Sequence, residues 1–175
     1  MKAAVLYGQK DIRYEEVETP VIGDEEVLVK VKATGVCGSD IPRVLGTAAH
    51  YYPIILGHEF SGEVVEAGRL VKNVKVGDRI SGAPLLPCHK CEDCLRGHYS
   101  QCRHYSFIGS RISGAWAEYV KMPAINAVRL PENVNFVQGA FFEPTTVALH
   151  GLDVMEFKGG YDVAITGMGT IGLLT

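Results

Sequence analysis

Four cysteines stand close together in this chain, at Cys88, Cys91, Cys94 and Cys102, with the spacing C-x2-C-x2-C-x7-C. Four thiolates at such short spacing can close a tetrahedral shell around one zinc ion. A closed shell leaves no position for a substrate, so this zinc is expected to be structural. The segment that carries it, residues 86–105, is therefore expected to be a loop-rich lobe whose shape depends on the metal.

Two other uses of clustered cysteines fit this segment less well. Disulfides are typical of secreted proteins, and the amino terminus becomes polar too soon for a signal peptide, so a cytoplasmic location is expected. A bacterial iron–sulfur motif closes with x3-C-P, whereas here the last gap is seven residues and Arg103 follows. The nearby histidines, His89, His98 and His104, are interpreted as solvated loop residues, because four sulfurs already fill a tetrahedron.

Charge and composition argue against two classes of partner. The formal net charge is −3 and no basic stripe is present, which argues against nucleic acid. No apolar run approaches the length of a membrane span. With 175 residues, of which 47% are hydrophobic, the chain has the size and composition of one globular domain with a core.

The first half of the chain reads as short strands separated by glycine and proline turns, which predicts a mainly β fold with short helices. The clearest strand is Glu26 to Lys32, where Val27, Val29 and Val31 alternate with Leu28 and two lysines. A brief helix is expected near residues 43–45, with Ser39 or Asp40 as its cap. Further strands are expected at 12–17, 60–67, near 80 and at 117–120, and helices around 137–141 and 147–152, the second beginning at Pro144.

The last fifteen residues change character. Residues 161–166 read as a buried parallel strand, which runs into Gly167, Gly169 and Gly172 in the pattern G-x-G-x-x-G. This arrangement matches the opening of a dinucleotide-binding fold, in which the pyrophosphate rests on a helix amino terminus. The remaining elements of that fold would follow Thr175, so we expect the front part of a longer protein, inactive by itself, and the choice between NAD and NADP stays open.

A second set of polar residues could form an open metal site. Cys37 lies far from the cysteine cluster, His58 and Glu59 precede a predicted strand, and Glu143 follows two phenylalanines. A carboxylate among apolar residues usually has a partner when it is buried. Taken singly, these residues can equally be an inert thiol, a loop histidine and surface glutamates, and spacing alone does not show that they converge.

Several motifs together resemble the zinc-dependent medium-chain alcohol and polyol dehydrogenases. They are Gly57-His58-Glu59 with Gly62, the run from Gly35 to Asp40, the four-cysteine lobe, Val76-Gly77-Asp78-Arg79 and the terminal G-x-G-x-x-G. Within that family, the stretches 42–43, 49–53 and 107–111 resemble most the enzymes that act on polyol phosphates. The resemblance implies a GroES-like β-barrel catalytic domain over residues 1–155 and the first strand and turn of a Rossmann domain over residues 156–175.

The resemblance also implies roles for individual residues. Cys37, His58 and Glu143 would bind a catalytic zinc, with Glu59 a further ligand or a supporting partner. Ser39 would take the proton of the substrate hydroxyl. Asp40 is a candidate to orient His58. A histidine that related enzymes often use in a proton relay is replaced here by Ile41-Pro42, so His50 or water would complete the relay, or the proton leaves by another route.

The activity implied is the oxidation of a secondary alcohol of a polyol phosphate with NAD(P), in a protein that forms homo-oligomers when complete. Arginine matches phosphate oxygens well, so Arg43 and Arg111, with His50 as a third candidate, are expected to hold the phosphate. Two alternatives stay open. One is a plain polyol or sorbitol, butanediol or threonine dehydrogenase. The other is a non-catalytic zinc-binding β-barrel.

Overall fold

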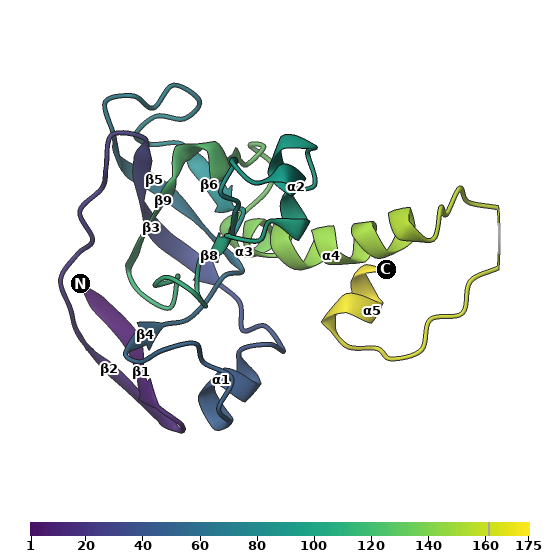
Figure 1. The fold of residues 1–175 in the computed structure, drawn as a ribbon, viewed down its shortest axis with the longest axis horizontal. Coiled ribbons are helices and arrows are strands. Elements are labelled where there is room, and N and C mark those ends of the chain that lie inside the picture. Colours follow the sequence, from purple (N-terminus) through teal and green to yellow (C-terminus); the bar gives the residue numbers. More distant parts are fainter. Residues whose placement is uncertain (161) are drawn as a thin grey trace.

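The fold is mainly β, as predicted. It was obtained as a computed structural model that describes residues 1–160 and 162–175 (Figure 1). The described strands form three sheets, with the orders β2-β1-β4, β10-β6-β5-β3-β9 and β7-β8. All their pairings are antiparallel. The strands are β1 (Lys2–Gly8), β2 (Asp11–Glu16), β3 (Glu26–Thr34), β4 (Ile54–Ile55), β5 (Phe60–Ala67), β6 (Arg79–Gly82), β7 (Leu85–Leu86), β8 (Ser106–Phe107), β9 (Tyr119–Pro123) and β10 (Ala127–Arg129).

The five-stranded sheet holds the main core. Its central strand β3 pairs with β5 on one side and β9 on the other. Val27 and Val29 are fully buried, and Leu28 on the opposite face is buried too, so both faces of the sheet are covered there. The register between β3 and β5 shifts twice, after Leu28 and after Val31. Such bulges bend a strand and increase its twist, which lets this sheet curve around its core.

The amino-terminal sheet is joined to the large one through residues 116–118, since the Glu118 amide donates to the Lys2 carbonyl at 3.0 Å and the Glu118 carbonyl accepts from the Val31 amide at 2.9 Å. The amide of Ala4 donates a hydrogen bond to the Trp116 carbonyl at 2.8 Å, and Ala3 forms a bridge with Ala117. On the other side of Trp116, its backbone amide donates to the Leu56 carbonyl at 2.9 Å. The segment around Trp116 therefore connects β1 to the loop that follows β4.

Short helices follow the strands. They are α1 (Ile41–Leu45), α2 (Glu92–Leu95), α3 (Phe136–Ala140), α4 (Phe142–Val154) and α5 (Thr170–Leu174), with 3-10 turns η1 (Tyr99–Gln101) and η2 (Ala124–Asn126). Only α4 is long, and it extends away from the sheets with α5 beside it (Figure 1). Across the described residues, none of these helices has both the length and the apolar character needed to cross a bilayer.

Two predicted helix starts differ in detail from the structure. Asp40 does precede α1, but its side chain accepts a hydrogen bond from the Cys37 amide at 3.1 Å instead of capping the helix. Pro144 is the third residue of α4, not the first. Proline is tolerated there because the first amides of a helix have no intrahelical partner.

The predicted parallel strand before the glycine motif is not formed. Tyr161 lies outside the described residues, and residues 162–166 have no regular secondary structure. A strand needs a neighbour to pair its backbone groups, and none of the described strands pairs with this segment. The turn itself has the predicted form. Gly167 has a φ of 94°, and a Cβ at Gly172 would overlap the Gly167 carbonyl oxygen, so both positions require glycine.

Candidate metal centres and the cavity beside them

The four clustered cysteines converge as the spacing suggested. The Sγ atoms of Cys88, Cys91, Cys94 and Cys102 all lie within 4.8 Å of one another. Two of these separations, Cys88 to Cys94 and Cys91 to Cys102, are 3.9 Å. With Zn–S bonds of about 2.3 Å, the corners of a tetrahedron are about 3.8 Å apart. The described cysteines are all free thiols, so this geometry fits one tetrahedral zinc and no disulfide.

The electrostatics of the lobe also fit a cation. Hydrogen bonds from the backbone amides of Cys94 and Arg103 lower the pKa of Cys91 to about 6. Burial raises the pKa of Cys94 to about 12. A zinc ion would stabilise all four thiolates together, because a metal-bound thiol is deprotonated. Loop amides therefore already favour the thiolate form of Cys91. A bound cation would offset the burial that keeps Cys94 protonated.

A second group gathers at one end of the paired strands β3 and β5, because Cys37 follows β3 while His58 and Glu59 precede β5. Ligand atoms of Cys37, His58 and Glu59 lie within 4.8 Å of one another. Glu143, on the first turn of α4, shares a cavity with them but is not part of this compact group. A thiolate, an imidazole and carboxylates are common zinc ligands, and a set of three protein ligands leaves an open position.

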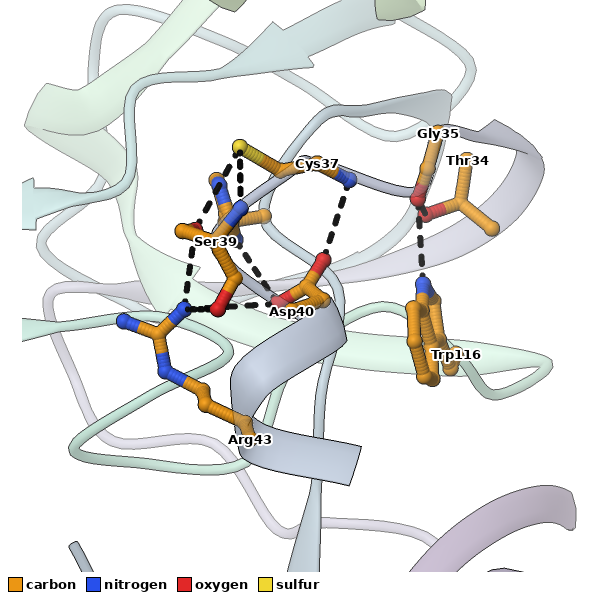
Figure 2. A network of polar contacts seen from close by, with 8 residues as sticks. Thr34, Gly35, Cys37, Ser39, Asp40, Arg43 and Trp116 are labelled. Carbon is orange, nitrogen blue, oxygen red and sulfur yellow. Dashed lines mark hydrogen bonds and ion pairs between the residues drawn. The ribbon is translucent and has the colours of Figure 1, made fainter. Parts of the chain in front are cut away.

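Glycines and the single tryptophan place these ligands. The amide of Gly35, just after β3, donates to the Glu59 carbonyl at 2.7 Å, and a Cβ at Gly35 would overlap the Glu59 carboxylate. Trp116 Nε1 donates to the Gly35 carbonyl at 3.0 Å (Figure 2). The Trp116 ring also covers Gly57, whose φ of 95° admits no side chain at low cost. The loops carrying Cys37 and His58 are thus held against each other.

Asp40 and His58 form a buried pair behind this group. The Asp40 side chain is 1% exposed and that of His58 is 5% exposed, with 3.7 Å between Oδ1 and Nδ1. Burial lowers the pKa of His58, which favours the neutral imidazole that binds metals. Burial also raises the pKa of Asp40, against the opposing effects of His58, the Cys37 amide and Arg43. Asp40 lies where a carboxylate would orient His58, as expected for a supporting partner.

The raised pKa of Glu143 is the clearest sign that this site lacks a positive charge. Burial, followed by the negative charges of Glu59 and Asp40, raises the pKa of Glu143 to about 7. Buried carboxylates are normally paired with a cation or bound to a metal. A divalent ion among Cys37, His58 and Glu59 would supply that charge. The donor set and this unbalanced carboxylate together fit the metal that the sequence suggested.

Ser39 lies directly beside Cys37. Its hydroxyl donates to the Cys37 Sγ at 3.3 Å, and its amide donates to the same sulfur at 3.5 Å. Arg43 Nη1 donates to the Ser39 hydroxyl at 2.8 Å and to the Ser39 carbonyl at 2.6 Å (Figure 2). The serine expected to take a proton and the proposed metal ligand Cys37 therefore stand next to each other.

A cavity of about 590 Å³ opens over this group. Of the residues singled out in the sequence, Cys37, Ser39, Arg43, His50, His58, Glu59 and Glu143 line it. Arg111 does not line it, but its guanidinium stacks 4.4 Å from the ring of Tyr105, which does. Arg111 Nη2 also donates to the Tyr105 hydroxyl at 3.3 Å. Arg111 thus reaches the edge of the cavity through Tyr105.

Three residues of the site were not anticipated. Phe107 packs edge-on against the His58 ring with 5.5 Å between the ring centres, Tyr105 lines the cavity, and Trp116 braces the ligand loops. Trp116 is the only tryptophan of the chain, which was an available signal. Nothing in the local pattern around Phe107 or Tyr105 indicated that these rings face the cavity.

Comparison with known proteins gives one family match and consistent relatives. Residues 23–132 match the model of the alcohol dehydrogenase GroES-like domain. Galactitol 1-phosphate 5-dehydrogenase of Escherichia coli strain K12 is 45% identical over 175 residues, which cover 99% of this chain and 51% of that protein. Sorbitol dehydrogenase of Bacillus subtilis strain 168 is 36% identical over 179 residues, which cover 99% of this chain and 51% of that protein.

Solved structures agree with these relatives. The crystal structure of galactitol-1-phosphate dehydrogenase from Escherichia coli has a TM-score of 0.95 at 45% identity, and the match covers 99% of this chain and 51% of that one. A Sinorhizobium meliloti 1021 protein described as a zinc-binding dehydrogenase, bound to NADP, has a TM-score of 0.94 at 42% identity, with the same coverage. The chain spans about half the length of these relatives, and the predicted GroES-like fold is confirmed.

Proposed function

The chain belongs to the alcohol dehydrogenase GroES-like domain family, and from this premise we propose that it is the catalytic part of a zinc-dependent, NAD(P)-dependent polyol-phosphate dehydrogenase. In this proposal residues 1–155 form the catalytic zinc domain and residues 156–175 begin the nucleotide-binding domain. One observation carries it. Cys37, His58 and Glu59 form an open group in a cavity with Glu143 and Ser39, apart from the closed group of four cysteines.

We assign the two groups different roles. The four cysteines hold a structural zinc and stabilise the lobe of residues 86–105. Cys37, His58 and Glu143, the carboxylate with the raised pKa, would hold the catalytic zinc and leave a fourth position open. Glu59, which belongs to the compact group, would be a further ligand or a supporting partner. Asp40 orients His58 from behind. Zinc held by these residues would supply Lewis-acid polarisation of an alcohol oxygen, and a bound nicotinamide cofactor would supply the hydride acceptor.

Ser39 handles the proton in this scheme. Its hydroxyl lies 3.3 Å from the Cys37 sulfur, beside the open position of the metal site. The proton of the substrate hydroxyl would pass to Ser39 Oγ, and the hydrogen that Ser39 carries would turn from the Cys37 sulfur and pass to solvent in the cavity, so the serine ends as it began.

The substrate class follows from the relatives and from the charges near the cavity. We propose galactitol 1-phosphate, because the dehydrogenase of that compound is 45% identical to this chain. Its phosphate would be held by His50, which lines the cavity, or by Arg111, whose guanidinium stacks on the cavity residue Tyr105 and can donate to phosphate oxygens. A second candidate is an unphosphorylated polyol, since sorbitol and butanediol dehydrogenases are 36% and 38% identical.

The test uses the complete protein that contains this chain, loaded with zinc. We expect reduction of NAD or NADP with galactitol 1-phosphate, at a higher kcat/KM than with galactitol, sorbitol, 2,3-butanediol or threonine. Arg111→Ala is expected to lose about 1.5–3 kcal/mol of transition-state binding with the phosphorylated substrate only, the range for hydrogen bonds to charged groups.

Arg13→Ala provides a matched control. Arg13 also stacks over a tyrosine, 4.6 Å from the ring of Tyr7, but on the strand β2. We expect Arg13→Ala to leave kcat/KM unchanged with both galactitol 1-phosphate and galactitol. Equal activity on galactitol and its phosphate, with no selective effect of Arg111→Ala, would reject the phosphate and favour the plain polyol.

A further inference from the structure

We propose that Arg43 is a positioning residue that fixes the Ser39 hydroxyl for proton transfer. This inference rests on the proposed function, in which Ser39 accepts the substrate proton. It changes the role expected for Arg43, from a ligand of the substrate phosphate to a residue that acts through Ser39. The geometry of the guanidinium carries it (Figure 2).

Both hydrogen bonds of Arg43 Nη1 go to the same residue. It donates to the Ser39 carbonyl at 2.6 Å and to the Ser39 hydroxyl at 2.8 Å. One guanidinium nitrogen carries two hydrogens, so these two bonds occupy it fully. Because the acceptors are a backbone atom and a side-chain atom of one serine, the pair of bonds fixes the rotation of the serine side chain about its Cα–Cβ bond.

The fixed hydroxyl is left with one free acceptor position. A serine oxygen has one hydrogen to donate and two lone pairs. The hydrogen is directed at the Cys37 sulfur, 3.3 Å away, and Arg43 occupies one lone pair. The second lone pair remains for the hydroxyl of a substrate in the cavity that both side chains line. A positive charge on Arg43 also favours negative charge developing on the oxygens around it.

Arg43 is held firmly enough for this role. Its side chain is only 17% exposed, and its Nη1 lies 3.7 Å from the buried Asp40 carboxylate. It stands four residues after Ser39 and three after Asp40, so it faces both across the start of α1. A planar guanidinium can span the two acceptors of Ser39 at once, which a lysine ammonium on a flexible stem does less well.

Kinetics of the complete zinc-loaded protein provide the first test. Arg43→Ala is expected to lower kcat about 10- to 100-fold, as for loss of other supporting hydrogen bonds at a site, with galactitol 1-phosphate and galactitol affected equally. KM, zinc content and melting temperature should change little. Arg43→Lys should recover part of kcat, and added guanidinium ion should partly rescue Arg43→Ala. Arg96→Ala is the matched control, because Arg96, just after α2, makes an i,i+4 ion pair with Glu92 at 2.6 Å.

A double-mutant cycle then separates positioning from other roles. In a Ser39→Ala background, Arg43→Ala should cost nothing further and guanidinium should rescue nothing, because Arg43 acts only through Ser39. The proposal would be overturned if Arg43→Ala lowers kcat further in the Ser39→Ala background, or if Arg43→Ala also loses zinc. A loss confined to the phosphorylated substrate would overturn it in favour of a phosphate ligand.

A crystal structure of Arg43→Ala gives a readout that is independent of activity. We expect the Ser39 side chain to occupy more than one rotamer in the variant and one rotamer in the parent protein. One unchanged rotamer in the variant would contradict the positioning role. Should the parent protein oxidise none of the alcohols, the proposed function fails, while the change of Ser39 rotamer would still support Arg43 as the residue that positions it.

Discussion

Trp116 donates a hydrogen bond from its indole nitrogen, at 3.0 Å, to the carbonyl oxygen of Gly35, which lies two residues before Cys37 (Figure 2). The same ring lies against Gly57, the residue before His58. One side chain therefore sets the separation between two loops that each carry a proposed metal ligand. Such supporting contacts commonly affect metal affinity although they do not touch the metal.

Trp116→Phe tests this brace. Phenylalanine keeps most of the packing against Gly57 but cannot donate to the Gly35 carbonyl. We expect the free energy of unfolding to fall by about 0.5–1.5 kcal/mol, the net contribution of one hydrogen bond. Zinc at the Cys37 site should be removed by lower concentrations of chelator, while the four-cysteine site keeps its metal. Tyr14→Phe, at an exposed position of β2, is the control, and equal chelator sensitivity of the two variants would contradict the brace.

Gly35→Ala should disrupt the open metal site sterically. A Cβ at Gly35 would overlap the Glu59 carboxylate, whereas one at Gly38, in the same loop, would meet nothing within 4 Å. We therefore expect Gly35→Ala to lose metal from the Cys37 group and Gly38→Ala to retain it, with zinc measured per chain by mass spectrometry. Equal zinc content in the two variants would mean that Glu59 has room to move and is not needed as a ligand.

Glu143→Gln should change stability in opposite directions with and without metal. In metal-free protein above the pKa of about 7, the Glu143 carboxylate is ionised near Glu59 and Asp40. Glutamine removes the cost of holding a charge there, which comes from burial first and then from this repulsion, so thermal unfolding of the metal-free variant at pH 8 should show a gain on the order of 1 kcal/mol once solvent screening is included. With zinc bound, the same substitution removes a ligand or a compensating charge and should lower stability and zinc affinity. A variant that is less stable in both states would show that Glu143 serves packing alone.

Much of the fold could be predicted because the strands follow simple local patterns. The alternation in residues 26–32 identified β3, and 60–67 matches β5. The strand before Gly167 was predicted wrongly, because apolar composition does not supply the neighbouring strand that its backbone requires. Pro144 was placed at the start of α4 from a general preference, but the helix begins two residues earlier, at Phe142.

The site could be predicted where its residues lie close together in the sequence, and less well where they come from distant segments. Cys88 to Cys102 lie within one short segment, so their convergence could be expected from the spacing itself. Cys37 and His58 come from different loops, and only the resemblance to a family brought them together. The contact of Arg43 with Ser39 was missed, because a sequence shows that two residues share a helix face but not which acceptor a long side chain selects.

The two metal groups should be separable by single substitutions. We expect two zinc ions per chain, one for each group, and one ion fewer in both Cys94→Ser and Cys37→Ser. Cys94→Ser should lose the structural ion, and Cys37→Ser should lose the catalytic ion. Cys94 is buried at the centre of the lobe, and structural zinc contributes about 10–16 kcal/mol to folding in small peptides, so its loss should unfold residues 86–105.

Limited trypsin digestion identifies which ion is lost. The lobe contains Lys90, Arg96 and Arg103, and cleavage there should be fast in Cys94→Ser and slow in Cys37→Ser and in the parent protein, because only the first variant loses the metal that orders these loops. Ser113→Ala serves as a control outside both metal groups. If both cysteine variants are cleaved alike, or if both lose the same ion, the chain has one metal centre and the division into a closed and an open site is wrong.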